Sequence, residues 1–87
     1  MDTNELRILL DNDLYDVRCE LARRAGSYGF LNVDDDTGEL DVDAFYEDYS
    51  QFHQFLEEVQ STVSDFIDDD LNIVDWDEIA LDIASEY

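Results

Sequence analysis

Residues 43–68 read DAFYEDYSQFHQFLEEVQSTVSDFID, and their hydrophobic spacing decides the fold. Asp43 is a suitable N-cap for a helix that starts there. The stretch predicts one long helix of about 35 to 40 Å, in which Ser61 and Thr62 would allow a bend. The hydrophobic side chains that recur every three or four residues, as on one face of an α-helix, are Phe45, Tyr49, Phe52, Leu56, Val59, Val63, Phe66 and Ile67.

A last helix is predicted after the acidic run 68–70 and a short link. Asp75 would be its N-cap, and Glu78 stands where it completes a capping box. The side chains expected on its inner face are Trp76, Ile79, Ala80, Ile83 and Tyr87.

The N-terminal part of the chain also has helical spacing. Asp2 and Glu5 form a capping-box pattern at its start, and Gly26 would end the helix. Residues 11–13, Asp-Asn-Asp, are unfavourable inside a helix, so two shorter helices are the alternative to one continuous helix, which we favour. The residues predicted to face the core are Leu6, Leu9, Leu10, Leu14, Val17 and Leu21.

Between Gly26 and Asp43 the hydrophobic period changes to about two, with turn residues at 35–38. This pattern predicts a short acidic β-hairpin, which has to pack on the helices because an isolated hairpin is marginal. The predicted fold is therefore α+β and mainly helical: three or four helices and one hairpin around one small core, in a single domain of residues 1–87. Leu31, Val33, Leu40 and Val42 would face the core, and Asn32, Asp34, Asp41 and Asp43 would face solvent.

The charge of the chain is distributed unevenly. All four arginines lie within the first 24 residues, there is no lysine, and residues 26–87 contain 19 of the 25 carboxylates. A compact body with a formal net charge of -21 repels itself, which costs folding free energy. A partner with a strongly positive surface would offset that cost, and grooves that bind nucleic acid are such surfaces.

The remaining composition limits the class of protein. Disordered acidic chains are poor in aromatic residues, whereas this chain is 45% hydrophobic and 13% aromatic, so we expect it to fold. Cys19 is the only cysteine, which excludes an intrachain disulfide and fits a reducing compartment. Neither a signal peptide nor an apolar segment of membrane-spanning length is apparent, so we expect a cytoplasmic protein that does not bind membranes.

No pattern of catalytic residues emerges. His53 is the only histidine and follows Phe52, which predicts a structural or surface role for it. Carboxylates are so numerous that no pair of them is selectively placed for acid and base catalysis. We therefore predict that the chain is not an enzyme, and that it has neither catalytic residues nor a cofactor.

Residues 32–43 resemble a calcium-binding EF-hand loop, which makes a calcium-binding module one alternative. The glycine of such a loop stands at position six, but Gly38 is at position seven, and the closing residue is an aspartate where glutamate is preferred. We therefore predict no metal site. The side chains at ligand-like positions are Asn32, Asp34, Asp36 and Asp43.

The acidic surface itself is the predicted binding site. Carboxylates on neighbouring helix turns lie about 5 to 6 Å apart, so an acidic helix approximates a row of phosphates, which are spaced about 3.4 Å along each DNA strand. The other alternative is a halophilic structural or interaction domain, although a general solubility pressure would leave basic residues scattered along the chain. The residues predicted to bind the partner are Asp34, Asp35, Asp36, Asp41, Asp43, Glu47, Asp48, Glu58, Asp65, Asp68, Asp69, Asp70, Asp75 and Asp77.

The C-terminal stretch LNIVDWDEIALDI, residues 71–83, followed by Glu86 and Tyr87, resembles the acidic, tryptophan-containing helix of the Ocr-like anti-restriction proteins of phages. More broadly, the chain is similar to small acidic phage inhibitors that imitate DNA, including certain anti-CRISPR proteins. The resemblance implies a stoichiometric inhibitor in the host cytoplasm that blocks the DNA groove of a defence nuclease or of its DNA-recognition subunit. Such a protein does not itself bind nucleic acid, and it can act as a monomer or as a homodimer.

Overall fold

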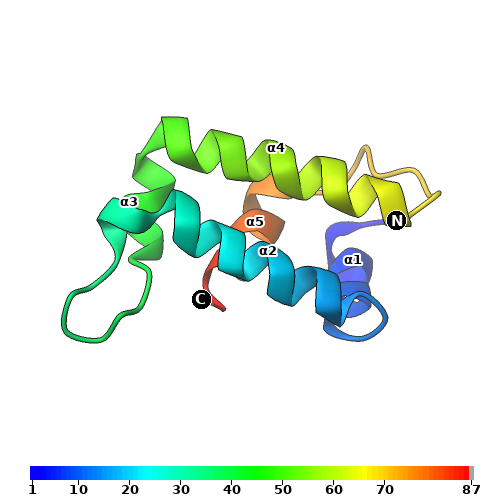
Figure 1. Ribbon diagram of the computed structural model, residues 1–87. Helices are drawn as coiled ribbons and strands as arrows, with labels where there is room; N and C mark the ends of the chain where they lie inside the picture. The colour runs from blue at the N-terminus through cyan, green and yellow to red at the C-terminus, as the bar shows by residue number, and fades with distance from the viewer. Residues whose placement is uncertain (87) are drawn as a thin grey trace.

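Helices make up all the regular structure of residues 1–86, the part of the chain that the computed structural model describes. Figure 1 shows α2 and α4 side by side, and α5 packs against each of the other four α-helices. The described residues form no β-sheet, so the α+β prediction is wrong and the fold is all-α. The elements are α1 (Thr3–Asp11), α2 (Tyr15–Tyr28), the 3₁₀ turn η1 (Phe30–Asn32), α3 (Val42–Glu47), α4 (Tyr49–Phe66) and α5 (Trp76–Ala84).

The predicted hairpin is a loop closed by one antiparallel bridge between Val33 and Leu40. Backbone hydrogen bonds of 2.7 and 2.8 Å flank the bridge, but the pairing extends no further. On one side the chain already turns into η1, and on the other Asp41 caps α3, so no residues are left to lengthen the strands. Leu40 is buried as predicted, Val33 and Val42 are half-buried, and Leu31 is 80% exposed.

The predicted first helix is broken into α1 and α2 at residues 12–14, so the alternative of two shorter helices is correct. The Asn12 side chain donates a 2.8 Å hydrogen bond to the carbonyl of Ile8, a local bond of the kind that lets asparagine end helices. The predicted stop at Gly26 is wrong, because α2 continues to Tyr28 and Gly29 is its C-cap.

The predicted long helix is also two helices, α3 and α4, which meet at Asp48. The Asp48 side chain accepts a 3.3 Å hydrogen bond from the backbone N–H of Gln51 and so caps α4. The N-cap of α3 is Asp41 rather than the predicted Asp43, and it accepts a 3.2 Å hydrogen bond from the N–H of Ala44. Asp41 and Asp48 thus cap two successive helices, although the hydrophobic spacing of this segment is that of one helix.

α4 itself is continuous and does not break at Ser61 and Thr62. Two members of the predicted hydrophobic stripe lie outside the core: Tyr49 is 74% exposed and Phe66 is 59% exposed. Phe55, which the stripe did not include, is fully buried. The side chains that α4 contributes to the core are Phe52, Phe55, Val59 and Val63.

The core is apolar throughout the described residues, with no buried polar or charged side chain. Gly29 lies against the loop and α3, where the side chains of Leu40 and Phe45 fill the space that a Cβ would need. Asp75 caps α5 as predicted, and Tyr87 lies outside the described residues. The largest fully buried side chains are Phe45, Phe55, Leu6, Leu21, Ile79, Ile83, Val59 and Val63.

Candidate functional site

Each of the four arginines makes an ion pair with a carboxylate of the chain. Arg7 joins α1 to α5, and Arg24 joins α2 to α4. Arg18 on α2 pairs with Asp11 of α1 and with Glu86 after α5, and Arg23 pairs with Glu20 of its own helix. The carboxylates that take part in these ion pairs are Asp11, Glu20, Glu58, Glu78, Asp82 and Glu86. The positive charge of all four arginines is thus paired with carboxylates of the same chain.

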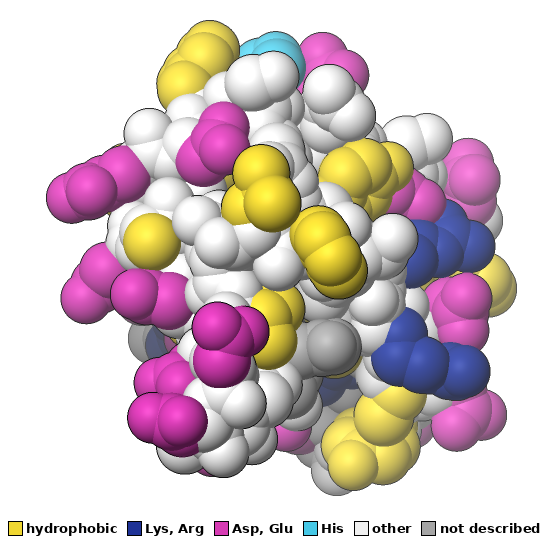
Figure 2. All heavy atoms as spheres, turned by 60° about the vertical axis from the view of Figure 1, so that its left-hand side comes forward, with side chains coloured by type: hydrophobic (Ala, Val, Ile, Leu, Met, Phe, Trp, Pro, Cys, Tyr) yellow, Lys and Arg dark blue, Asp and Glu magenta, His cyan; other side chains and the backbone are white. Residues whose placement is uncertain are grey.

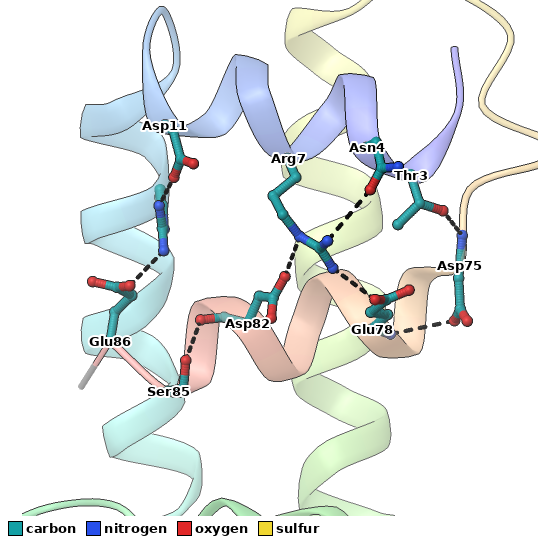
Figure 3. A network of polar contacts seen from close by, with 10 residues as sticks. Thr3, Asn4, Arg7, Asp11, Asp75, Glu78, Asp82, Ser85 and Glu86 are labelled. Atoms are coloured by element: carbon teal, nitrogen blue, oxygen red, sulfur yellow. Dashed lines mark hydrogen bonds and ion pairs between the residues drawn. The ribbon is translucent and has the colours of Figure 1, made fainter.

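Arg7 is the centre of a polar network between α1 and α5 (Figure 3). Its Nη2 lies 2.8 Å from Glu78 Oε1, and its Nε lies 2.5 Å from Asp82 Oδ2. The hydrogen bonds to Glu78 and then to Asp82 raise the pKa of Arg7. Glu78 was predicted to complete the capping box by accepting the N–H of Asp75, but its side chain faces Arg7. Thr3 Oγ1 accepts this hydrogen bond instead, at 2.9 Å. Much of the acidic side of α5 is therefore occupied.

Glu58 is the one predicted partner-binding residue that is paired with an arginine. It is half-buried between α2 and α4, where it pairs with Arg24 and accepts a 2.6 Å hydrogen bond from the hydroxyl of Tyr28. The hydrogen bond to Glu58 raises the pKa of Tyr28, and burial adds to the effect. Glu58 thus faces the interior of the helix pair.

Five further predicted residues accept local hydrogen bonds, four of them through one carboxylate oxygen and Asp48 through both. Three are the N-caps Asp41, Asp48 and Asp75, whose side chains accept backbone hydrogen bonds of 3.2 to 3.3 Å. Asp34 and Asp70 accept hydrogen bonds of 2.8 and 2.9 Å from the N–H groups two residues later. A carboxylate has about four acceptor sites, so each of these groups is still able to bind a cation.

The other eight predicted residues are exposed, and within residues 1–86 their side chains make no hydrogen bond or ion pair. They are Asp35, Asp36, Asp43, Glu47, Asp65, Asp68, Asp69 and Asp77. Most of these carboxylates lie at the two ends of α4. We call Asp34, Asp35, Asp36, Asp43 and Glu47 the loop-end cluster. We call Asp65, Asp68, Asp69 and Asp70 the link-end cluster.

α4 separates the two clusters and is itself poor in charge. It is about 26 Å long at roughly 1.5 Å per residue. Apart from Glu57 and Asp65, its exposed polar residues are uncharged: Ser50, Gln54, Ser61 and Ser64. The carboxylates therefore form two groups at opposite ends of this helix, and not the continuous row that the helical spacing had suggested.

The alternative of a calcium site finds no support in the loop. Among residues 1–86, no three His, Cys, Asp or Glu side chains are placed to hold a metal ion. The ring of His53 stacks on Tyr49, with centroids 5.1 Å apart, and its Nε2 lies 3.3 Å from Glu57 Oε1. None of the described helices has the length and apolar character needed to span a membrane.

Exposed aromatic and aliphatic side chains at the loop end are a feature that the sequence analysis missed. Phe30 is 76% exposed, Tyr46 is 46% exposed, and Leu31 and Tyr49 are also at the surface. Figure 2 shows hydrophobic side chains on this side of the molecule, with acidic side chains around them and arginines near one edge. The signal that could have predicted the exposure of Tyr49 is Asp48, a possible N-cap that ends one helix and starts the next just before this residue.

We compared the chain with protein-family models, with curated proteins and with solved structures, and found no match.

Proposed function

We propose that this protein is a DNA mimic that blocks the nucleic-acid-binding groove of a basic host protein. The observation that carries the proposal is its charge per unit length. The body is 40 Å long and 23 by 18 Å across, and its formal net charge is -21. A 40 Å length of duplex DNA carries about 24 phosphate charges, at one per roughly 1.7 Å of axis. The two values differ by only a few charges.

The internal ion pairs strengthen this argument. The arginines pair with six of the 25 carboxylates, so 19 are left without an arginine partner among the described residues. With the arginines already paired, little positive charge opposes the approach of a basic groove. A groove that holds phosphates with lysine and arginine would gain the same ionic contacts from these carboxylates.

The two acidic clusters suggest the kind of groove. They are separated by α4, about 26 Å long, which is somewhat less than the roughly 34 Å of one turn of B-DNA. A partner would therefore present two basic patches within one turn of the duplex it normally binds. On the resemblance to small phage inhibitors, we propose that this partner is a host defence protein, either a restriction enzyme or a CRISPR effector. No step of catalysis is required of this chain.

A capture experiment tests the proposal. The protein is immobilised and exposed to a bacterial lysate, and the bound proteins are challenged with duplex DNA. We expect a bound protein that duplex DNA releases, that binds DNA in a gel-shift assay, and that this chain displaces from DNA at about one to one. The matched control is a variant with Asp35, Asp36, Asp68 and Asp69 changed to lysine, which should capture nothing. Equal capture by the variant, or a bound protein that DNA does not release, would contradict the proposal.

A further inference from the structure

A cavity of about 260 Å³ opens between α3, α4 and the first turn of α5. Its lining combines aromatic rings with two carboxylates and contains no arginine. The residues that matter here are Tyr46, Glu47, Tyr49, Phe52, His53 and Asp77.

Four aromatic rings line the cavity and form two pairs. Tyr46 meets Phe52 edge to face, with ring centroids 5.0 Å apart and an interplanar angle of 70°. Phe52 is held from the core side by Phe45, at 5.7 Å. Tyr49 and His53 stack nearly parallel, at 18°, which gives a flat second surface. Tyr46 and Tyr49 are well exposed, so ring surface is available to a ligand.

The carboxylates add charge to these rings. Glu47 ends α3, and Asp77 is in the first turn of α5. Both are exposed, and within residues 1–86 neither side chain has a hydrogen bond or ion pair. Aromatic faces and carboxylates both attract cations, and the arginines of this chain pair with other carboxylates. The cavity therefore combines two independent features that favour a cationic ligand.

We infer that this cavity binds the guanidinium group of an arginine side chain on the partner. A guanidinium is planar, so it can stack on a flat aromatic surface, and it has five N–H donors for carboxylates. A quaternary ammonium has no donor and would leave Glu47 and Asp77 without hydrogen bonds. A lysine ammonium is compact and strongly hydrated, so it gains less from the rings.

The inference deepens the proposed function, because the arginine would come from the basic groove of the partner. It also describes a contact that DNA does not make. Phosphates offer no aromatic surface, so the loop end would hold one partner arginine in a way that the phosphate backbone of a duplex cannot.

A titration with acetyl-arginine-amide tests the site directly. The side-chain resonances of Tyr46, Tyr49 and His53 are followed by NMR at physiological salt, with acetyl-lysine-amide as the matched probe of equal charge. We expect the arginine probe to saturate these shifts at about millimolar concentration, and the lysine probe to bind about two- to fivefold more weakly. Equal affinity for the two probes would overturn the inference, since a general acidic surface does not distinguish them.

Matched variants separate the cavity from the overall charge. Glu47→Gln with Asp77→Asn should weaken the arginine probe about tenfold. Asp68→Asn with Asp69→Asn removes the same charge at the link end and should change the affinity less than about twofold, because exposed charges beyond about 8 Å are screened. Tyr49→Leu should weaken binding about two- to fivefold without loss of the fold, since Tyr49 is 74% exposed. Equal weakening by both double variants would contradict the site.

The same variants distinguish failure of the inference from failure of the proposed function. If the arginine probe binds at the cavity but no DNA-binding protein is captured from the lysate, the proposed function fails and the arginine site stands. In the opposite case, a captured protein is released by duplex DNA, but it binds Tyr49→Leu and the double variant at Glu47 and Asp77 with unchanged affinity. The inference alone is then wrong.

Discussion

The hydroxyl of Tyr28 on α2 donates a 2.6 Å hydrogen bond to the carboxylate of Glu58 on α4. These are the two longest helices, and the same carboxylate also pairs with Arg24. Glu58 lies in the part of the chain that has no arginine, and it helps to hold α2 against α4. The carboxylates at the two ends of α4 have no such structural role.

This hydrogen bond predicts a loss of stability at high pH. It raises the pKa of Tyr28 above its ordinary value of 10.0. The folded state therefore holds the phenol proton more tightly than the unfolded state. The contribution to stability is complete below about pH 10 and is lost as the pH rises through the raised pKa of the folded state. Unfolding measured against pH should show this loss.

Tyr28→Phe is the control for that prediction. The variant should lose about 1 kcal/mol of unfolding free energy at neutral pH. As the pH rises above about 10 and through the raised pKa of Tyr28, the variant should approach the unsubstituted protein in stability, because the unsubstituted protein then loses the proton that makes the bond. The difference in phenolate absorbance between the two proteins isolates the titration of Tyr28. A midpoint at or below the ordinary value would show that the bond is absent.

Leu31 and Leu40 distinguish the observed loop from the predicted hairpin. A hairpin with both residues on the core face would make Leu31→Ser and Leu40→Ser similarly damaging. In the structure Leu31 is 80% exposed and Leu40 is 8% exposed. We expect Leu31→Ser to change the unfolding free energy by less than about 0.5 kcal/mol, and Leu40→Ser to lower it by about 2 to 4 kcal/mol. Urea unfolding of the two variants measures this, and equal losses would favour the hairpin.

The helix break at Asp48 makes a second prediction about the fold. Asp48→Ala removes the cap of α4 and should cost about 1 kcal/mol. Asp43→Ala removes the same charge from an exposed position inside α3 and should cost less than about 0.5 kcal/mol. If residues 43–68 formed one helix capped by Asp43, the order of the two losses would be reversed. Thermal unfolding at equal ionic strength decides between the two arrangements.

Salt should stabilise the protein. Most of the carboxylates have no arginine partner, so their mutual repulsion opposes folding at low ionic strength. We expect the melting temperature to rise between no added salt and about 0.5 M salt at neutral pH, over which the Debye length shortens severalfold. A flat melting temperature would argue against strong repulsion in the folded state. A chain that folds only in molar salt would favour the halophilic alternative.

Charge reversal at the two ends of α4 tests the partner-binding surface. Asp35 and Asp36 to lysine, or Asp68 and Asp69 to lysine, should each weaken binding of a captured partner by several kcal/mol, or more than about a hundredfold. The matched control is Asp13 and Asp16 to lysine, which makes the same charge change in the N-terminal part of the chain, at residues that belong to neither cluster.

The control should have a smaller effect, and circular dichroism should show that all three variants keep the fold. Equal losses of affinity in the three variants would indicate attraction by net charge alone. Such a result would remove the argument for two acidic binding clusters.

The sequence correctly predicted where a helix starts when one cap had no competitor. Asp2 and Asp75 cap α1 and α5 as expected, because each precedes a clear hydrophobic period. The errors arose where several aspartates competed. Asp41, Asp43 and Asp48 are all suitable caps, and the hydrophobic period alone cannot show which of them the fold uses.

The candidate site was predictable in its charge but not in its arrangement. Composition alone indicated an acidic surface without basic residues from position 25 onward. The inward orientation of Glu58 and the loss of the capping-box role of Glu78 depend on contacts between distant helices. Such contacts leave no local pattern. The exposure of Tyr49 was likewise not predictable, because its spacing fits a stripe of buried hydrophobic residues.

The pairing of every arginine within the fold also bears on the lifetime of the protein in a cell. The unpaired carboxylates repel one another in the free folded chain, and a basic partner would reduce this repulsion. Binding would therefore stabilise the folded state by mass action. Free chains would then open and be degraded sooner than bound ones. On the proposed function, proteolysis would remove the surplus, and the amount of this protein would follow the amount of the partner that it binds.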